Sequence, residues 1–138
     1  MASLPLEPLR LKPGVDLRHS LEAHAKERGE SGFVLAGIGS LSVGQIRMAG
    51  ADEPSTLAGP LEVLSLSGAI GPDGVHLHLS VSDATGKVTG GHLAHGSQVL
   101  TTMELVIVRL MDWSLGREWD AATGYPELVV RKGSRGSM

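Results

Sequence analysis

The sequence has no cysteine, and this excludes several classes of protein at once. A chain of 138 residues without a thiol forms no disulfide framework, cysteine-ligated zinc site, iron–sulfur cluster or thiol nucleophile. Any metal site must therefore take its ligands from histidine nitrogens and carboxylate oxygens. Six histidines are available for that purpose.

Aromatic residues are nearly as scarce. The four in the chain are Phe33, Trp113, Trp119 and Tyr125, so the core must be built from leucine, valine and isoleucine. So few aromatic side chains weigh against recognition of nucleic acid by base stacking. The formal net charge of −3 with neutral histidines also excludes a basic nucleic-acid coat.

Long apolar runs are absent as well. No run approaches the roughly 20 residues of a membrane span, and the first residues lack the pattern of a signal peptide. We therefore expect a soluble, cytoplasmic protein without a membrane partner. Because no repeat or linker divides the chain, we expect a single domain over residues 1–131 and a flexible tail over 132–138.

The order of turn residues and apolar residues predicts one helix followed by strands. The helix is expected to begin after Asp16 and to stop at Gly29, with Leu17, Leu21 and Ala25 on its buried face. The sequence predicts an α+β fold, a mainly antiparallel sheet of about seven strands with this one main helix near the N-terminus. The expected strands are a first one within 4–11 that ends with 9–11, followed by 32–38, 41–48, 61–67, 75–81, 99–111 and 127–131.

The segment Val75–Ser82 carries the most chemistry. Because strand side chains alternate between two faces, Leu77 and Leu79 are expected to point into the core, and His76 and His78 away from it. A turn at residues 83–86 would bring the Gly-Gly-His sequence that ends at His92 back beside them. The three imidazoles can then share one ligand.

Three interpretations of this cluster stay open. It is a metal site, a pocket for an anion or another small ligand, or a group of exposed histidines whose spacing follows from strand alternation alone. Three histidines with an open fourth position are typical of catalytic zinc, which activates a bound water. On the metal interpretation the cofactor is a divalent ion, with zinc as the first expectation.

The other histidines are weaker candidates. His95 follows His92 closely and is either part of a cofactor or ligand pocket or an ordinary surface histidine. His19 and His24 are five residues apart on the expected helix, which is poor spacing for a shared ligand. We expect both of them on the surface.

Glu104 stands within the apolar segment 101–108, where an isolated carboxylate is costly to bury. It can hydrogen-bond a liganding histidine, act as the acid or base of an enzyme, or form a salt bridge with Arg109 or Arg47. The sequence alone leaves these roles open.

Several stretches together resemble the PPC domain, the "plants and prokaryotes conserved" family, and they occur in the family's order across residues 9–130. They are Arg-Leu-Lys-Pro-Gly at 10–14 with Asp-Leu at 16–17, Gly-Phe-Val at 32–34 with Gly-Ile-Gly-Ser at 37–40, Leu-Ser-Leu-Ser-Gly at 64–68, His-Leu-His at 76–78 with Gly-Gly-His-Leu at 90–93, and Gly-Tyr-Pro-Glu-Leu at 124–128. Each stretch is short, but the ordered set is specific.

The resemblance implies a single domain that assembles as a homotrimer. In plants the domain follows AT-hook motifs in nuclear DNA-binding proteins, and prokaryotic members are stand-alone domains labelled as DNA-binding proteins. Some members resemble metal proteins, which implies metal ligation by His76, His78 and His92 here. The fold also resembles acetolactate decarboxylase, a zinc enzyme that uses three histidines.

Two hypotheses follow. The first is a trimeric binding or regulatory protein with a metal at the three histidines, a small-molecule ligand, and DNA as a partner implied by the resemblance. The second is a metal-dependent lyase that acts on a small carboxylate, with Glu104 as its acid or base. The expectation of DNA binding is weakened because the sequence at 131–136 lacks the Gly-Arg-Pro core of an AT-hook.

Overall fold

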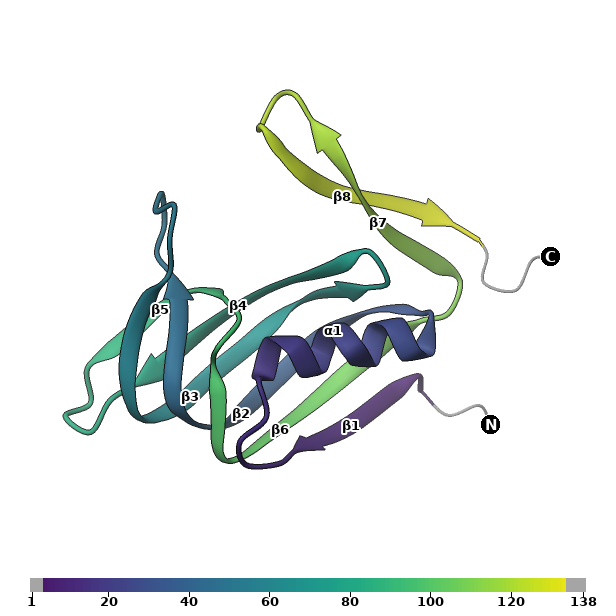
Figure 1. Ribbon diagram of the computed structural model, residues 1–138. Coiled ribbons are helices and arrows are strands. Elements are labelled where there is room, and N and C mark those ends of the chain that lie inside the picture. The colour runs from purple at the N-terminus through teal and green to yellow at the C-terminus, as the bar shows by residue number, and fades with distance from the viewer. Residues whose placement is uncertain (1–3, 134–138) are drawn as a thin grey trace.

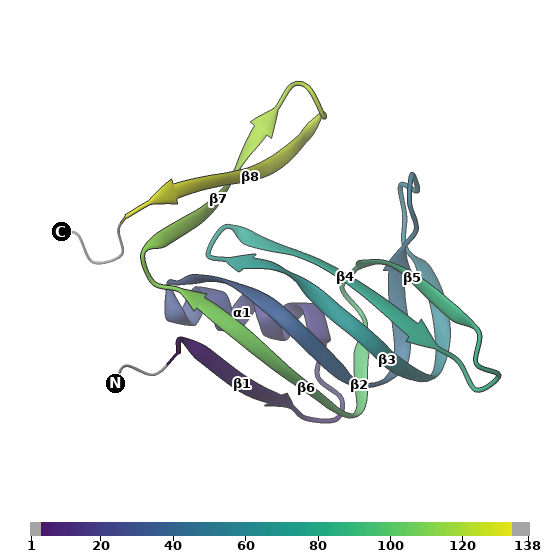
Figure 2. The ribbon, with the colours of Figure 1, turned by 180° about the vertical axis from the view of Figure 1, so that it is seen from behind.

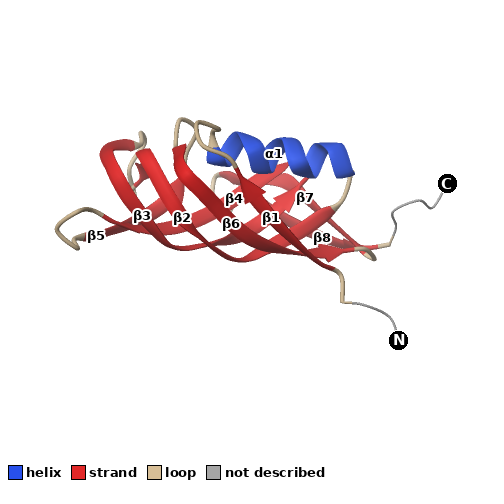
Figure 3. Ribbon diagram, turned by 90° about the horizontal axis from the view of Figure 1, so that it is seen from below, coloured by secondary structure: helices blue, strands red, loops and turns tan. Residues whose placement is uncertain are grey.

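The computed structural model describes residues 4–133. A six-stranded antiparallel sheet forms the body, and a separate two-stranded sheet extends from it (Figure 1). The single helix lies on one face of the large sheet (Figure 3). The predicted α+β class is therefore confirmed. The elements are β1 (Leu6–Leu11), α1 (Leu17–Arg28), β2 (Ser31–Arg47), β3 (Ser55–Gly71), β4 (Gly74–Ser82), β5 (Val88–Leu93), β6 (Gln98–Leu110), β7 (Trp113–Asp120) and β8 (Tyr125–Lys132).

The helix α1 forms where the sequence predicts it. Asp16 caps its first turn, because Oδ1 accepts a hydrogen bond from the backbone N–H of His19 at 2.9 Å. Gly29 ends it in the left-handed region at φ 62°, a conformation that glycine adopts without strain. Leu17, Leu21 and Ala25 are fully buried against the sheet.

The large sheet curls because β5 has two partners. The strand order is β1-β6-β2-β3-β4-β5, and β5 also pairs with the far end of β2. The strands β2, β3, β4 and β5 therefore close on one another (Figure 2). This closure brings the end of β2 beside the strand that carries His92.

One strand prediction was wrong. The ranges 32–38 and 41–48, expected as two strands, are the single 17-residue strand β2. Register shifts against β6, including one between Gly39 and Leu41, absorb the irregularity that the sequence pattern suggests is a strand end. Two of the eight strands, β5 and β7, are absent from the expected ranges, and β7 pairs along its whole length with β8.

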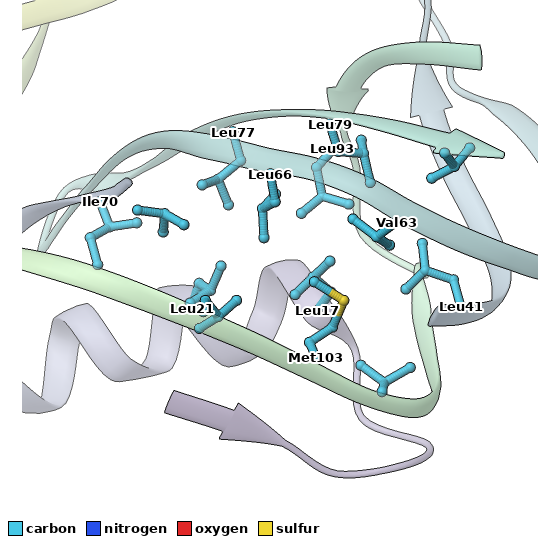
Figure 4. Packing of buried hydrophobic residues seen from close by; sticks show 14 of the residues in the cluster. Leu17, Leu21, Leu41, Val63, Leu66, Ile70, Leu77, Leu79, Leu93 and Met103 are labelled. Carbon is cyan, nitrogen blue, oxygen red and sulfur yellow. The ribbon is translucent and has the colours of Figure 1, made fainter. Parts of the chain in front are cut away.

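The core lies between α1 and the sheet and is aliphatic, as expected (Figure 4). Leu17 and Leu21 of the helix meet side chains from several strands, among them Leu66 and Met103. The four aromatic side chains are at least one third exposed, so none of them belongs to this core.

Two expectations concern other parts of the chain. The predicted tail at 132–138 lies outside the described residues from residue 134 on, and Lys132 is the last residue of β8. No helix within residues 4–133 is long and apolar enough to cross a membrane.

Candidate metal centre

The strand β4 presents two histidines on its exposed face. Leu77 and Leu79 are 2% and 4% exposed and pack in the core, while His76 and His78 between and beside them are exposed. The alternation predicted from the sequence is thus confirmed. The hairpin turn between β3 and β4 fixes the register, in which Ser67 lies opposite His78 and Ala69 opposite His76.

A tight turn returns the chain from β4 to β5. The carboxylate of Asp83 accepts hydrogen bonds from the backbone N–H groups of Thr85 at 2.8 Å and Lys87 at 3.1 Å. The bonds from Thr85 lower the pKa of Asp83. The resulting antiparallel register places His92 directly opposite His78.

Gly91 allows β5 to approach β2. A Cβ atom at this position would lie 2.6 Å from the carbonyl oxygen of Arg47 and 2.9 Å from Cγ2 of Ile46. Contacts this short do not occur, so any larger residue would push the two strands apart. The glycine next to His92 is therefore needed for the second pairing of β5.

The three histidines form one cluster. Ring nitrogens of His76, His78 and His92 lie within 4.8 Å of one another, and the ring centroids are 4.5–5.1 Å apart. Tetrahedral zinc with bonds of about 2.0–2.1 Å holds its nitrogen ligands about 3.4 Å apart. Small side-chain rotations would bring the three nitrogens to that distance, so the donor set fits a divalent ion with one open position.

The surroundings of His76 and His92 favour the neutral form of these two imidazoles. Although His76 is exposed, the partial loss of its hydration lowers its pKa, and the charges of His78 and Arg117 lower it further. Partial burial also lowers the pKa of His92, together with the charge of Arg47. A neutral imidazole is the form that binds a metal.

A cleft of about 780 Å³ opens beside the cluster. The helix, the end of β2 and the β7–β8 hairpin all contribute to its walls, and the three histidines line it together. The charged residues of the cleft are Arg18, Glu22, Arg47, Asp52, Asp73, Arg117 and Glu127.

The structure does not bring His95 to the cluster. Its Nε2 lies 2.7 Å from Oε1 of Glu22, on the helix, and its side chain is more than half exposed. Glu22 in turn pairs with Arg18 at 3.2 Å. Burial raises the pKa of Glu22, but the hydrogen bonds to His95 and Arg18 outweigh this and lower it.

The two helix histidines also lie apart from the cluster. His19 is exposed, as expected, and its backbone N–H donates a hydrogen bond to the capping Asp16. His24 contributes Nε2 to a contact of 3.2 Å with Glu7 of β1. That pairing, together with the partial burial of His24, differs from the expected free surface position.

Glu104 lies on a different part of the molecule. It is exposed on β6, opposite Arg10 on one side and Ile38 on the other. It lines a separate cleft with these residues, and none of the three histidines lines that cleft. The strands β2 and β3 separate β6 from β4, so about 14 Å of sheet lies between the two strands. Arg109, one of the two expected salt-bridge partners of Glu104, pairs instead with Glu30 at 2.8 Å.

Sequence reasoning missed three residues of the cleft. Arg47 reaches it through the pairing of β2 with β5, and Arg117 and Glu127 reach it through the β7–β8 hairpin. Glu127 belongs to the Gly-Tyr-Pro-Glu-Leu stretch, so a signal for it was present in the sequence. No local pattern marks the two arginines.

The chain is similar in sequence to part of a longer curated protein. Over 131 residues the chain is 47% identical to the bifunctional protein GlmU of Synechococcus sp. (strain JA-3-3Ab). The match covers 94% of this chain and 21% of that protein, so the chain spans about a fifth of the curated relative.

Solved structures are similar over nearly the whole chain. A hypothetical protein of Salmonella enterica is 35% identical with a TM-score of 0.89, and the match covers 96% of each chain. A metal-containing protein of Archaeoglobus fulgidus is 26% identical with a TM-score of 0.75, and the match covers 94% of this chain and 99% of that one.

The ordered motifs of the sequence point to one family, and the fold agrees with them. The family model of the Plants and Prokaryotes Conserved (PCC) domain matches residues 7–111, which is well over half of the chain. The chain belongs to the Plants and Prokaryotes Conserved domain family.

Proposed function

We propose that this PCC domain is a homotrimeric binding module that holds a divalent ion, zinc in the first place, at His76, His78 and His92. The observation that carries the proposal is the convergence of the three ring nitrogens within 4.8 Å. The similarity to a metal-containing protein of Archaeoglobus fulgidus supports it. The ion would be bound by three neutral ligands and would keep its full charge of about +2.

Metal content of the purified protein tests this proposal. The protein is prepared without an affinity tag, and zinc, iron, nickel and manganese are measured per chain. We expect close to one equivalent in the wild type and in the control His19→Ala, which removes a histidine outside the cluster. The double variant His76→Ala/His78→Ala should lose the metal, because one remaining imidazole binds an ion weakly. Absence of metal from the wild type after incubation with zinc and dialysis would overturn the proposal.

Exposed apolar side chains support self-association. Leu35 and Ile38 of β2 and Leu64 of β3 are each about half exposed. The β7–β8 hairpin adds Trp119 and Tyr125, which are about two thirds exposed. Exposed apolar side chains that gather into one patch are typical of an interface between proteins.

DNA is the partner that the family resemblance implies. The described surface adds little support, since the chain has a net charge of −3 and the aromatic side chains are few. The measurement is affinity for duplex DNA against salt concentration, because phosphate contacts weaken steeply as salt rises. Failure to bind at low salt would remove this partner.

A metal-dependent lyase is the second candidate, and Glu127 is the observation that favours it. Glu127 shares the cleft with the histidines, and its negative charge acts on His76. Because Glu104 lies in another cleft, we assign the acid or base role in this alternative to Glu127. Carbon dioxide release from acetolactate by the zinc-loaded wild type, and its loss in Glu127→Gln, would support the lyase.

A further inference from the structure

The cleft contains two arginines whose side chains have N–H donors left without an acceptor among the described residues, some of them in Arg47 and all of them in Arg117. We propose that Arg47 and Arg117 bind a small oxyanion, a carboxylate or a phosphate group, at the open position of the metal held by the three histidines. The inference rests on the proposed metal site and names the class of ligand that the site takes.

Arg47 belongs to a row of side chains that crosses three strands. It lies directly opposite His92 on β5, which in turn lies opposite His78 on β4. Residues directly opposite one another on antiparallel strands place their side chains on the same face of the sheet. One guanidinium nitrogen of Arg47, Nη1, donates to the carbonyl oxygen of Ala51 at 3.0 Å. The other two nitrogens form no hydrogen bond within residues 4–133 and are left to donate into the cleft.

Arg117 reaches the same cleft from the second sheet. Its backbone N–H donates to Oδ2 of Asp73 at 3.3 Å, which fixes β7 beside the turn before β4. Its side chain is partly buried and makes no hydrogen bond or ion pair with any described residue. A guanidinium with five free N–H donors that is partly withdrawn from water is suited to a bidentate oxyanion.

The carboxylates of the cleft differ in their partners. Glu22 is paired with Arg18 and His95, and Asp73 accepts the hydrogen bond from the hairpin backbone. The side-chain carboxylate of Glu127 accepts no hydrogen bond from the described residues. Asp52 also lines the cleft. The anion would therefore bind near Arg47 and Arg117, where the negative charge of Glu127 repels it. Neutralising Arg117 should weaken anion binding, and neutralising Glu127 should strengthen it.

Charge balance supports the same ligand. Three neutral imidazoles leave the charge of the divalent ion uncompensated, and the three arginines and four carboxylates of the cleft together add only one negative charge. An oxyanion that ligates the ion neutralises part of this charge and accepts the free N–H groups. A ligand without an acceptor oxygen would leave the guanidinium of Arg117 without a hydrogen-bond partner among the described residues.

The test uses the full chain loaded with cobalt(II), whose visible spectrum reports a change of ligand at the metal. Methyl phosphate and propionate are titrated separately, and the tighter of the two identifies the oxyanion. In the wild type we expect a saturable spectral change. Arg117→Gln should keep the cobalt spectrum of the free protein and bind the anion about tenfold or more weakly, because a charge-assisted hydrogen bond is lost. Glu127→Gln should bind it several-fold more tightly.

The control is Arg131→Gln on the same hairpin. Arg131 pairs with Glu118 at 2.6 Å, both side chains are more than half exposed, and neither lines the cleft. Its loss removes one positive charge from the hairpin without touching the cleft, so anion affinity should stay at the wild-type value. Equal weakening in Arg131→Gln and Arg117→Gln would show a general charge effect and overturn the assignment.

The two proposals fail in different ways. If wild-type protein binds cobalt but shows no saturable change with either anion, the ligand proposal is overturned and the metal site stands. If the wild type binds no metal, the metal site fails, and calorimetric titration of the same anions decides the ligand proposal. Binding that weakens in Arg117→Gln then supports the arginine pocket, and its absence overturns the pocket too.

Discussion

At the scale of single residues, the surroundings of His76 and His92 determine how readily these two side chains take up a proton. His76 is exposed and His92 is partly buried, but both lose some hydration in the cleft and both stand near an arginine, and these two influences lower the pKa of each imidazole. The two groups therefore resist protonation in the folded chain. In the unfolded chain the same side chains titrate near the ordinary value of about 6.5.

This difference predicts a dependence of stability on pH for the metal-free protein. Because the folded pKa lies below the unfolded one, the unfolded chain binds more protons as the pH falls through about 6.5. The contribution of these histidines to the free energy of unfolding is fully present above about pH 6.5. It is lost progressively as the pH falls from there toward the pKa values of the folded state. Urea denaturation at pH 7.5 and 5.5 should show a smaller decrease in the free energy of unfolding for His76→Gln/His92→Gln than for the wild type.

The control for this measurement is His19→Gln, which removes a histidine outside the cleft. It should reproduce the wild-type decrease. A double variant whose decrease equals that of the wild type would contradict the assignment of the pH effect to the cleft.

The histidines could be predicted from the sequence and the arginines could not, for a physical reason. His76, His78 and His92 are placed by strand alternation and by one short turn, both of which are local. Arg47 is placed by the pairing of β2 with β5, and Arg117 by the docking of a hairpin, and both depend on contacts far apart in the chain. Glu104 illustrates the converse, because its apolar surroundings in the sequence indicate burial and β6 nevertheless exposes it.

At the scale of elements, the short strand β5 holds the site together. It pairs with β4 over most of its length and with β2 at its end, and Gly91 makes the second pairing sterically possible. The position of His92 therefore depends on a neighbour without a side chain.

Substitution of this glycine gives the corresponding prediction. In Gly91→Ala the added Cβ would collide with the backbone of Arg47, so β5 must move away from β2. We expect stability to fall by about 1–3 kcal/mol, as for other overpacked sites. Zinc affinity should fall about tenfold, because a residue that positions a ligand is disturbed. Thermal denaturation and competition with a zinc indicator measure the two effects.

Gly86→Ala separates positioning from stability. Gly86 lies in the turn between β4 and β5 at φ 85°, with no atom within 4 Å of an added Cβ. The substitution should destabilise the fold by about 1 kcal/mol through backbone strain alone. Its zinc affinity should equal that of the wild type. If Gly86→Ala and Gly91→Ala lost zinc affinity equally, general destabilisation would explain the loss, and the positioning role of Gly91 would be contradicted.

Prediction of the elements from sequence succeeded where the signal was short-range. The helix has a cap, an apolar stripe and a stop within a few residues, and the β3–β4 turn has its Gly-Pro-Asp-Gly sequence. The long strand β2 was divided in two because bulges resemble strand ends when the partner strand is unknown. The strand β7 was missed because its partner β8 supplies the pairing, while its own side chains are mostly exposed.

At the scale of the whole molecule, large apolar side chains are exposed on two parts of the structure. The exposed residues of β2 and β3 lie on the body of the domain, and those of β7 and β8 lie on the hairpin that extends from it (Figure 1). In the proposed homotrimer, these are the side chains that neighbouring copies are expected to cover.

Light scattering on the wild type should give three times the chain mass of 14.4 kDa. In Ile38→Asp the mass should fall toward that of one chain, because burial of an unpaired carboxylate at an interface is costly. The matched control is Val88→Asp, in which an equally exposed apolar residue of β5 is replaced outside this group. A wild type with the mass of a single chain would contradict the homotrimer.

The closure of β5 onto β2 has a consequence for the way the large sheet ends. An open sheet has two edges at which another chain can add a strand and start aggregation. Here one end of the strand order folds back onto the sheet, and the outermost strand at the other end is β1. That strand carries Pro8, which has no N–H to offer an incoming strand, and the charged Arg10. The pairing that places His92 in the cleft therefore also limits the growth of the sheet into fibrous assemblies.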